Sequence, residues 1–363
     1  MIEYYIFSLP CILAAVVSFN NKIDRVFRLL FLFFIVFYVL IVGLRFGSVD
    51  YFNYEDIYYK TSISDFSFPF FDSNSGTTGN EFIYATATVV FKYFGLPFQV
   101  FLFFVALVSI SLKFYIFKTY SKYFALSVLV YLSFNFTKDL GQIRNALSAG
   151  IILMSIIFIS SRRPLGFYFS IFIASGIQIF AITALPLYII HNNRFRFHIL
   201  IVGLTVAMAL PIIGGVMPFL IKFLEQLSGP VISKVIGYYN NSQSIDGVDP
   251  YGVGNIFRLF MILWLLCFFR KDLKRNPFSD ASLTVLCYGV LLYTLLYSVS
   301  IFSYRANEAF SSLTLAIVLP FFVASINKYF RMPVYFVAVS YCLFYMYIAF
   351  KVNVMPYQNA LFL

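Results

Sequence analysis

Charged residues are scarce in this chain. Only 11% of its 363 residues are Asp, Glu, Lys or Arg, whereas 61% are hydrophobic and 21% are aromatic. A soluble domain carries roughly 25% charged residues, so this composition excludes an ordinary soluble protein. Long apolar stretches recur along the chain, and about 20 apolar residues are enough to cross a bilayer. The composition therefore predicts an all-α polytopic integral membrane protein that forms a single domain over residues 1–363.

Several groups that carry out common chemistry are also rare. The two histidines, His191 and His198, lie in one basic gap, so they cannot supply a metal cluster or a Ser-His-Asp triad at the other membrane face. The four cysteines lie within apolar stretches and have no metal-like spacing. We therefore expect no metal and no cofactor. No glycine-rich phosphate loop occurs, which argues against ATP use. Acidic residues are absent from the middle of the apolar stretches, which argues against an ion-coupled transporter.

The net charge of +11 reflects basic residues between the apolar stretches and does not indicate nucleic-acid binding. More than half of the 26 basic residues lie in short gaps between apolar stretches. They are Lys22, Arg25, Arg28, Lys113, Lys118, Lys122, Arg162, Arg163, Arg194, Arg196, Arg270, Lys271, Lys274, Arg275, Lys328 and Arg331. Cytoplasmic loops carry an excess of Lys and Arg, so these gaps are expected to face the cytoplasm and both termini to face outward.

The apolar pattern predicts about twelve transmembrane helices. We expect spans near 2–19, 28–44, 97–116, 123–137, 142–160, 165–177, 179–191, 198–220, 254–270, 281–303, 308–326 and 333–350. The first run begins Met-Ile-Glu without a basic segment, so it is read as a retained span and not as a cleaved signal. The segments 165–177 and 179–191 are short. They are either one kinked helix or two half-helices that meet at Gly176–Gln178.

Two larger periplasmic loops are expected, at about 45–96 and 221–253. The apolar segment 81–95 lies within the first loop, but Glu81 and Lys92 flank or interrupt it. If it spanned the membrane, the basic residues that follow would move to the outer side. We therefore interpret it as a re-entrant or interfacial helix.

The segment Gly43-Leu44-Arg45-Phe46-Gly47-Ser48-Val49-Asp50-Tyr51-Phe52-Asn53-Tyr54 closes the second span. Arg45 could hold a phosphate with two parallel hydrogen bonds. Asp50 could accept a proton or orient a sugar hydroxyl, and Tyr51 and Tyr54 offer flat faces that pack against sugar rings. The alternative is an arginine that reaches the lipid headgroups among interfacial tyrosines.

The strongest single indication of function is Arg144, near the start of the fifth span. An ionisable group at membrane depth is costly and usually marks a functional site. Gln142 and Asn145 lie beside Arg144 on the same strip of the helix, which is otherwise rich in Ile, Leu and Met. The alternative is a structural ion pair of Arg144 with Asp139 or Glu308.

Two further arginines lie at the ends of late spans. Arg305 follows the span 281–303 and could instead pair with Glu308 three residues on. Arg258 lies about one turn inside the span 254–270 and is equally ambiguous. Arginines at several span ends together indicate a site for an anionic ligand at the membrane face.

The order and spacing of these motifs resemble the EpsG family of bacterial polysaccharide polymerases, which is related in role to the Wzy O-antigen polymerases. The resemblance depends on the segment 43–54, on Asn80-Glu81-Phe82-Ile83-Tyr84 and on the segment 142–150. It covers roughly the first half of the chain, and Arg305 is a looser match. Members often carry a histidine near 176–182. Gln178 lies there in this chain, so a catalytic histidine at that position is excluded.

The resemblance implies a multi-pass enzyme of the inner membrane with its active site facing the periplasm. It would transfer a growing glycan from undecaprenyl pyrophosphate to a sugar hydroxyl of a lipid-linked oligosaccharide repeat unit. We expect Arg45, Arg144 and Arg305 to bind the pyrophosphate. Asp50 is the first candidate for a catalytic base and Glu81 the second. The residues expected to position the substrate are Tyr51, Tyr54, Gln142, Asn145 and Arg258.

The expected partners are lipid-linked donor and acceptor oligosaccharides and membrane lipids, with a chain-length regulator and a flippase as further candidates and no nucleic acid. Three other functions share some of these features. A lipid-linked oligosaccharide flippase would need basic residues along a cavity open to both sides. A glycan O-acyltransferase usually needs a histidine at its site. An O-antigen ligase uses the same donor and is poorly separated from a polymerase by sequence.

Overall fold

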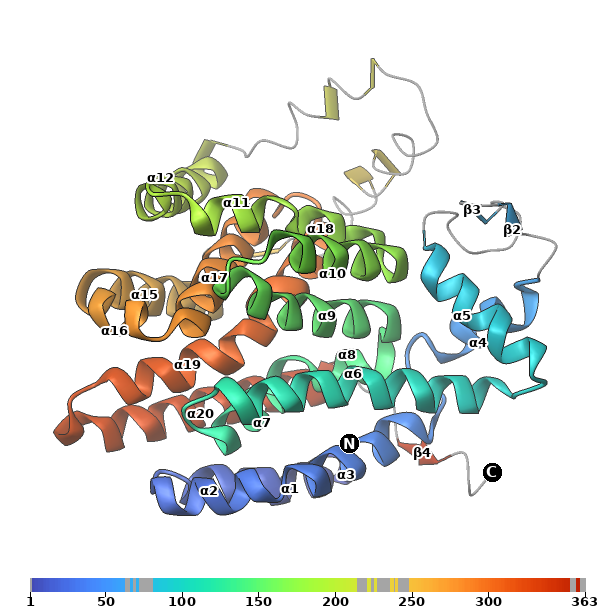
Figure 1. Ribbon diagram of the computed structural model, residues 1–363, viewed down its shortest axis with the longest axis horizontal. Coiled ribbons are helices and arrows are strands. Elements are labelled where there is room, and N and C mark those ends of the chain that lie inside the picture. The colour runs from blue at the N-terminus through green and yellow to red at the C-terminus, as the bar shows by residue number, and fades with distance from the viewer. Residues whose placement is uncertain are drawn as a thin grey trace.

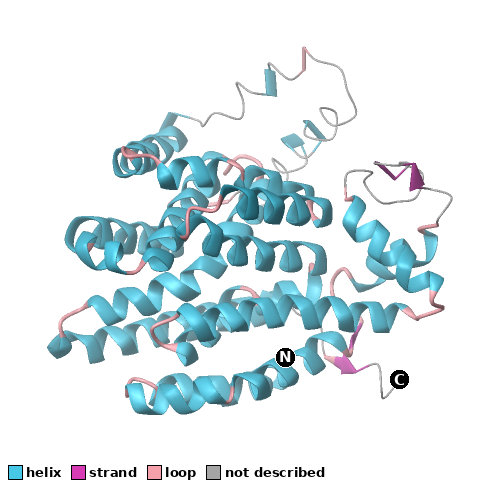
Figure 2. Ribbon diagram, viewed as in Figure 1, coloured by secondary structure: helices cyan, strands magenta, loops and turns pink. Residues whose placement is uncertain are grey.

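The computed structural model describes residues 2–62, 66–67, 70–71, 81–213, 221–222, 225–226, 236–237, 239–240, 248–352 and 357–359. Helices dominate these residues (Figures 1 and 2). The segment 73–80 and most of 221–247, which belong to the two periplasmic loops expected at about 45–96 and 221–253, lie outside the described residues. The strands in this described part of the chain are two-residue pieces: β1 (Arg45–Phe46) pairs with β4 (Gln358–Asn359), and β2 (Phe66–Ser67) pairs with β3 (Phe70–Phe71).

The first half of the chain forms short and long helices that run back and forth. They are α1 (Ile2–Val17), α2 (Asn21–Leu29), α3 (Phe31–Gly43), α4 (Tyr51–Lys60), α5 (Phe82–Tyr93), α6 (Phe98–Tyr120), α7 (Phe124–Phe134), α8 (Phe136–Gly141), α9 (Ile143–Ser160) and α10 (Pro164–Ile177). The other elements are η3 (Ile179–Ala184), α11 (Pro186–Asn192), α12 (Arg196–Ala209), η4 (Leu210–Ile213), α15 (Val253–Phe268), α16 (Arg270–Arg275), α17 (Pro277–Leu295), α18 (Ser300–Ala306), η5 (Asn307–Ser312), α19 (Leu313–Ser325) and α20 (Lys328–Val352).

Proline marks where several of these helices begin. Pro164, Pro186 and Pro277 are the first residues of α10, α11 and α17. The first helical residue needs no intrahelical N–H bond, and the fixed φ of proline suits that position. The prolines therefore set the helix starts without interrupting a span.

The structure confirms an all-α membrane protein. Within the described residues, five helices are long and apolar enough to cross a bilayer, and the bent pair Lys22–Leu29 and Phe31–Gly43, with an angle of 54°, would make a sixth. Within the described residues, each of the twelve predicted spans overlaps a helix or helix pair, but several of these have only 10–17 residues. The number of twelve spans, and the re-entrant or interfacial placement of α5, stay predictions.

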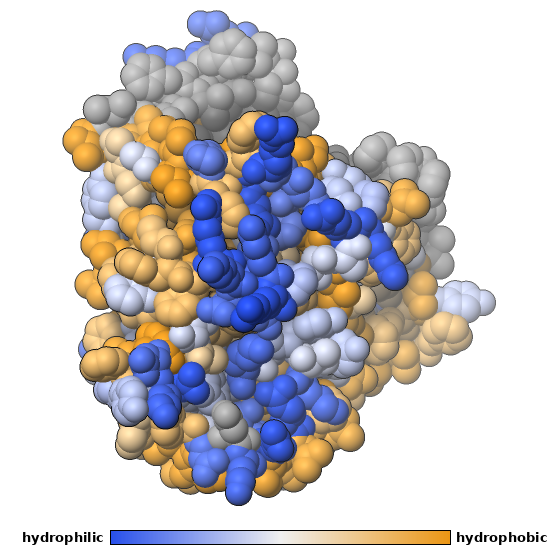
Figure 3. Space-filling view, turned by 60° about the vertical axis from the view of Figure 1, so that its left-hand side comes forward, coloured by the Kyte–Doolittle hydropathy of each residue, from blue (hydrophilic) through white to orange (hydrophobic). Residues whose placement is uncertain are grey.

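The turns that carry the basic gaps gather at one end of the bundle. These turns join α1 to α2, α6 to α7, α9 to α10, α11 to α12, α15 to α17 and α19 to α20, at the left-hand end in Figure 1. Figure 3 shows a continuous band of hydrophilic side chains on this end, with apolar surface on both sides. The basic gaps therefore share one end of the bundle, and the side of the membrane that this end faces stays a prediction. We refer to this end as the basic end.

Lys113 does not belong to the basic end, contrary to the sequence interpretation. Its side chain is only 1% exposed, and Nζ lies 2.6 Å from Oδ2 of Asp139 on α8. Ser109 and Tyr131 also donate to the Asp139 carboxylate, at 2.7 and 2.8 Å. A buried charge must be paired and hydrogen-bonded. Lys113 therefore joins α6 to α8 inside the bundle.

The helix is interrupted at Gln178, and a second short helical segment follows. α10 ends at Ile177, and the 3₁₀ helix η3 begins at Ile179. Of the two alternatives for 165–191, the structure shows two separate helical segments and not one kinked helix. A Cβ at Gly176 would lie 2.6 Å from Cγ1 of Ile83. Glycine at this position therefore allows α5 to pack closely against the end of α10.

Candidate functional site

A cavity of about 740 Å³ opens at the end of the bundle opposite the basic end. Its walls come from α4, the α7–α8–α9 segment, Gln178, α15, α18, η5 and the last turns of α20. Most of these walls are places where a helix begins, ends or breaks, so polar side chains can reach the cavity. The polar residues that line it include Asp50, Asn53, Tyr54, Lys138, Gln142, Arg144, Asn145, Gln178, Arg258, Tyr304, Arg305, Asn307, Glu308 and Tyr345.

Two arginines of this cavity have no carboxylate partner among the described residues. Arg258 is 5% exposed and donates from Nη1 to Oδ1 of Asn307, and its Nε has no hydrogen-bond partner in the described part of the chain. Its guanidinium lies 5.6 Å from the ring centre of Phe134. Arg305 is half-buried and makes no ion pair or hydrogen bond with any residue that the structure describes. The pair brings two positive charges to the cavity without neutralising them.

Arg144 is held at the side of the cavity by an ion pair with Glu81, which precedes α5. Neither of the partners suggested by the sequence, Asp139 or Glu308, pairs with it. Its guanidinium also lies 5.2 Å from the ring centre of Tyr54 and 5.4 Å from that of Tyr84. Nε of Arg144 has no hydrogen-bond partner among the residues that the structure describes. Arg144 therefore keeps donor capacity in a position fixed by one carboxylate and two aromatic rings.

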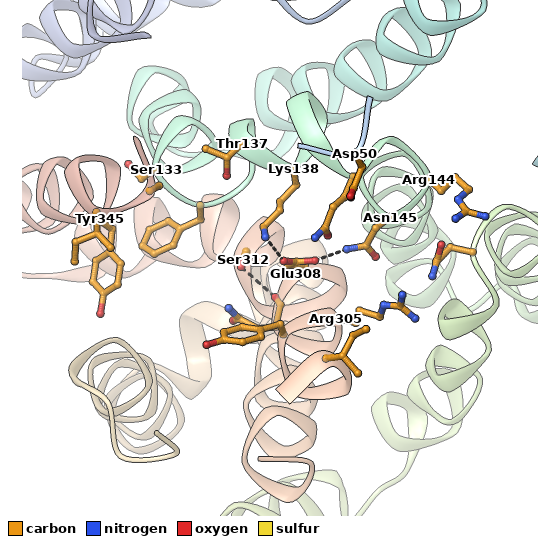
Figure 4. Close-up of a pocket in the computed structure, with 18 of the residues that line it drawn as sticks. Asp50, Ser133, Thr137, Lys138, Arg144, Asn145, Arg305, Glu308, Ser312 and Tyr345 are labelled. Carbon is orange, nitrogen blue, oxygen red and sulfur yellow. Dashed lines mark hydrogen bonds and ion pairs between the residues drawn. The ribbon is translucent and has the colours of Figure 1, made fainter. Parts of the chain in front are cut away.

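Glu308 lies at the centre of a polar cluster, where Lys138 and Asn145 converge on its carboxylate (Figure 4). Nζ of Lys138 lies 2.6 Å from Oε1, and the Asn145 amide donates to Oε2. Glu308 does not pair with Arg305, the alternative considered from the sequence. It belongs to the π-helical segment η5, whose wider turn places Asn307 and Glu308 at the cavity. Such π segments are frequent at functional sites.

Asp50 and Tyr54 line the cavity from the loop before α4 and from α4 itself. The Asp50 carboxylate accepts no hydrogen bond from a residue within the described ranges and does not cap α4. Tyr54 is buried beneath Arg144. Asp50 is therefore the carboxylate of the cavity that is not already committed to a cation. Glu81, the second candidate base, is bound to Arg144 and does not line the cavity.

Arg45 and Tyr51 lie outside the cavity lining. Arg45 is 2% exposed, donates to the carbonyl of Val42, and its Nε lies 3.2 Å from Oγ of Ser48. The hydroxyl of Tyr51 donates to Oε1 of Gln99, whose amide donates to the Gly43 carbonyl at 2.6 Å. These contacts fix the chain between α3 and α4. They place Asp50 at the cavity but leave Arg45 no open face.

Several lining residues had no assigned role in the sequence interpretation. Lys138 and Asn307 were given no function, and Glu308 was considered only as an ion-pair partner of Arg144 or Arg305. Tyr345 lies on α20 among other aromatic residues, where a tyrosine near a span end usually reads as an interfacial anchor. A signal was available for Lys138 and Glu308, because both are charged residues beside an apolar span.

Comparison with known proteins agrees with the motif resemblance. Neither the curated proteins nor the solved structures contain a match to this chain. In the described part of the chain, no group of three His, Cys, Asp or Glu side chains could hold a metal ion. Residues 28–359, nearly the whole chain and not only its first half, match the EpsG family. The protein therefore belongs to the EpsG family, a Wzy-like family of membrane polysaccharide polymerases.

Proposed function

We propose that the cavity is the active site of a polymerase that uses lipid-linked oligosaccharides as both donor and acceptor. The growing glycan leaves undecaprenyl pyrophosphate and passes to a sugar hydroxyl of an incoming lipid-linked repeat unit. The bond between the anomeric carbon and the pyrophosphate oxygen breaks, and the bonding electrons leave with the pyrophosphate. The acceptor oxygen forms the new glycosidic bond, and its proton passes to a base.

The observation that carries this proposal is the pair of uncompensated arginines. Arg258 and Arg305 line the same cavity and have no carboxylate partner among the described side chains. A leaving pyrophosphate develops negative charge, and preorganised cations that face it lower the barrier. Arg144, fixed by Glu81, would provide a third cationic contact at the side of the cavity. Arg45 would then act through the shape of the loop and not through direct contact.

The remaining lining residues fit the acceptor half of the reaction. Asp50 is the base that we propose, because its carboxylate faces the cavity without a described cation beside it. Tyr54, Gln142 and Asn145 would position the sugars. Lys138 forms an ion pair with Glu308 and Asn145 donates a hydrogen bond to it, which suits a positioning residue better than a base.

The position of the cavity supports an active site at the outer face of the inner membrane. It lies opposite the basic end, and the positive-inside rule assigns that end to the cytoplasm. A lipid pyrophosphate lies at the membrane boundary, where these helix ends meet. An enzyme with this donor needs no nucleotide at the site. Whether the acceptor is a lipid-linked repeat unit or another glycan decides between a polymerase and a ligase.

The direct test is synthesis by the purified protein in nanodiscs. Synthetic undecaprenyl-pyrophosphate repeat units of several structures would be supplied without nucleotide, and the product would be read as a glycan ladder on a gel. We expect a ladder with the wild-type protein and none with Arg258→Gln or Arg305→Gln. Arg275→Gln, which removes an exposed arginine at the basic end, is the matched control and should leave the ladder unchanged.

The other outcomes are equally informative. Absence of a ladder from folded wild-type protein with every repeat unit would contradict the polymerase. Transfer of one unit to an added glycan without elongation would indicate a ligase. Transbilayer movement of the lipid without bond formation would indicate a flippase.

A further inference from the structure

A second cavity, of about 390 Å³, lies at the basic end, and none of its lining residues lines the first cavity. It forms where α2, the turn between α6 and α7, and the α19–α20 junction meet. Four cations line it, Arg25, Arg28, Lys122 and Arg331, and one carboxylate, Asp24. Figure 3 shows the hydrophilic surface of this end of the molecule. The catalytic proposal uses none of these residues.

The single carboxylate is already engaged by the protein. Asp24 is 3% exposed, lies 3.1 Å from Nη2 of Arg28, and accepts the N–H of Ala125 at 3.1 Å. Its charge offsets one of the four cations. The cavity therefore keeps three positive charges, those of Arg25, Lys122 and Arg331, that no described carboxylate neutralises.

Backbone carbonyls orient two of the guanidinium groups. Arg28 donates to the carbonyls of Lys118 at 2.7 Å and Ser121 at 3.0 Å. Arg331 donates to the Ile326 carbonyl from Nε at 3.3 Å and from Nη2 at 3.1 Å. A carbonyl fixes the direction of a guanidinium but leaves its net charge in place. Of the three uncompensated cations, Arg331 is therefore held in place, whereas Arg25 and Lys122 are exposed and can adjust to an anion.

The surface beside the cavity is apolar and exposed. On α2, Ile23, Val26 and Leu29 follow one another at intervals of three residues and are 37%, 55% and 79% exposed. Lys22, Arg25 and Arg28 repeat at the same interval on the other face. A helix with one basic and one apolar face lies in the membrane interface. Across the cavity, Phe330 and Met332 flank Arg331 and are also exposed.

We propose that this cavity binds the phosphate headgroup of an anionic phospholipid, with the acyl chains lying along α2 and the start of α20. The three uncompensated cations recognise the phosphate, and the exposed apolar rows contact the chains. Basic pockets between helices on the cytoplasmic side of membrane proteins bind lipid headgroups in this way. An acidic peptide or free phosphate would use the cations but leave the apolar rows uncovered.

Native mass spectrometry of the delipidated full chain in detergent tests the proposal. Dioleoylphosphatidylglycerol would be titrated against neutral dioleoylphosphatidylcholine, and the occupancy of the first bound lipid would be compared. We expect the anionic lipid to bind more tightly. The double variant Arg25→Gln/Lys122→Gln should lose about fivefold in affinity for each cation removed, and so about 25-fold in total. Both residues are exposed and have no partner in the described structure, so the fold should persist.

The matched control is Lys274→Gln/Arg275→Gln, which removes the same two residue types from exposed positions at the same end but outside the cavity. Retained affinity in this control, together with loss in the cavity variant, supports the site. Equal loss in both would show only a general charge effect and overturn the proposal. So would displacement of the lipid by a tenfold excess of inorganic phosphate. If the double variant does not fold, Lys122→Gln alone is compared with Lys274→Gln under the same criteria.

Discussion

Lys138 on α8 and Glu308 on the π-helical segment η5 are separated by 170 positions in sequence, from 138 to 308, yet Nζ and Oε1 lie 2.6 Å apart. This ion pair joins the two halves of the chain across the cavity. The Lys138 side chain is 23% exposed and that of Glu308 only 7%. The pair therefore closes the cavity wall on its inner side and fixes the segment that carries Arg305 and Asn307.

Removal of one partner of this pair should destabilise the protein more than removal of both. Glu308→Gln or Lys138→Met leaves a partly buried charge uncompensated, which costs about 3–5 kcal/mol for a fully buried pair and less here because Lys138 is partly exposed. Thermal unfolding in detergent should show a smaller loss of stability for the double variant than for either single variant. Strictly additive losses would show that the two side chains do not interact.

The rate of glycan transfer should depend on the shape of the cavity arginines as well as on their charge. Arg258→Lys and Arg305→Lys keep one positive charge but remove the planar fork that binds two phosphate oxygens. Loss of one such donor lowers the rate of comparable reactions by about 10²–10³, and we expect a decrease of that size in ladder formation. Arg275→Lys is the control. Normal rates in both variants would show that the guanidinium geometry is not used.

Arg144 is expected to behave differently, since Glu81 already holds it. Arg144→Lys should lose both the pair geometry with Glu81 and the contacts with the rings of Tyr54 and Tyr84. Polymer synthesis should fall, and Glu81→Gln should reproduce part of the decrease by releasing Arg144. Unchanged polymerisation by Arg144→Lys at a normal protein level would reject a bidentate role for this residue.

Asp50→Asn should separate catalysis from folding. Its carboxylate has no hydrogen-bond partner among the described residues, so the free energy of unfolding in detergent should change by less than about 0.5 kcal/mol. Loss of a general base typically lowers the rate by about 10²–10⁴, which should appear in the rate of glycan transfer. The control is Asp56→Asn on α4, an exposed carboxylate paired with Lys60 at 2.6 Å. Wild-type turnover by Asp50→Asn would remove Asp50 from the mechanism.

The buried pair of Lys113 and Asp139 should be important for stability. Lys113→Met or Asp139→Leu alone leaves an unpaired charge in the bundle and should destabilise it by about 3–5 kcal/mol. The double variant should recover part of this loss in thermal unfolding, although the hydroxyls of Ser109 and Tyr131 lose their acceptor. A double variant less stable than both single variants would contradict this role.

Hydrophobic length and charge distribution were sufficient to predict the class of fold. Every predicted span falls on a helix or helix pair, because apolar runs between basic gaps leave a chain few alternatives in a bilayer. The prediction that Lys113 lies in a basic gap was wrong. The position of Lys113 near Lys118 suggested a loop, but its partner Asp139 comes 26 residues later and could not be read from local pattern.

The same limit applies to the candidate site. Asp50, Tyr54, Gln142, Arg144, Asn145, Arg258 and Arg305 do line one cavity, as expected of residues that share a site. Sequence could not reveal that Arg45 points into the protein and not into the cavity, because the motif around it looks the same in both cases. Nor could it show that Lys138 and Asn145 meet Glu308, since a contact between distant segments depends on how the helices pack.

The cavity draws its walls from residues as early as Asp50 and as late as Ala349. A nascent chain that is inserted helix by helix therefore has no complete site until α20 has left the ribosome and reached its place beside α7. Until then the cavity around Arg258 and Arg305 is incomplete. The activity that we propose for this cavity is thereby restricted to molecules that have completed their assembly in the membrane.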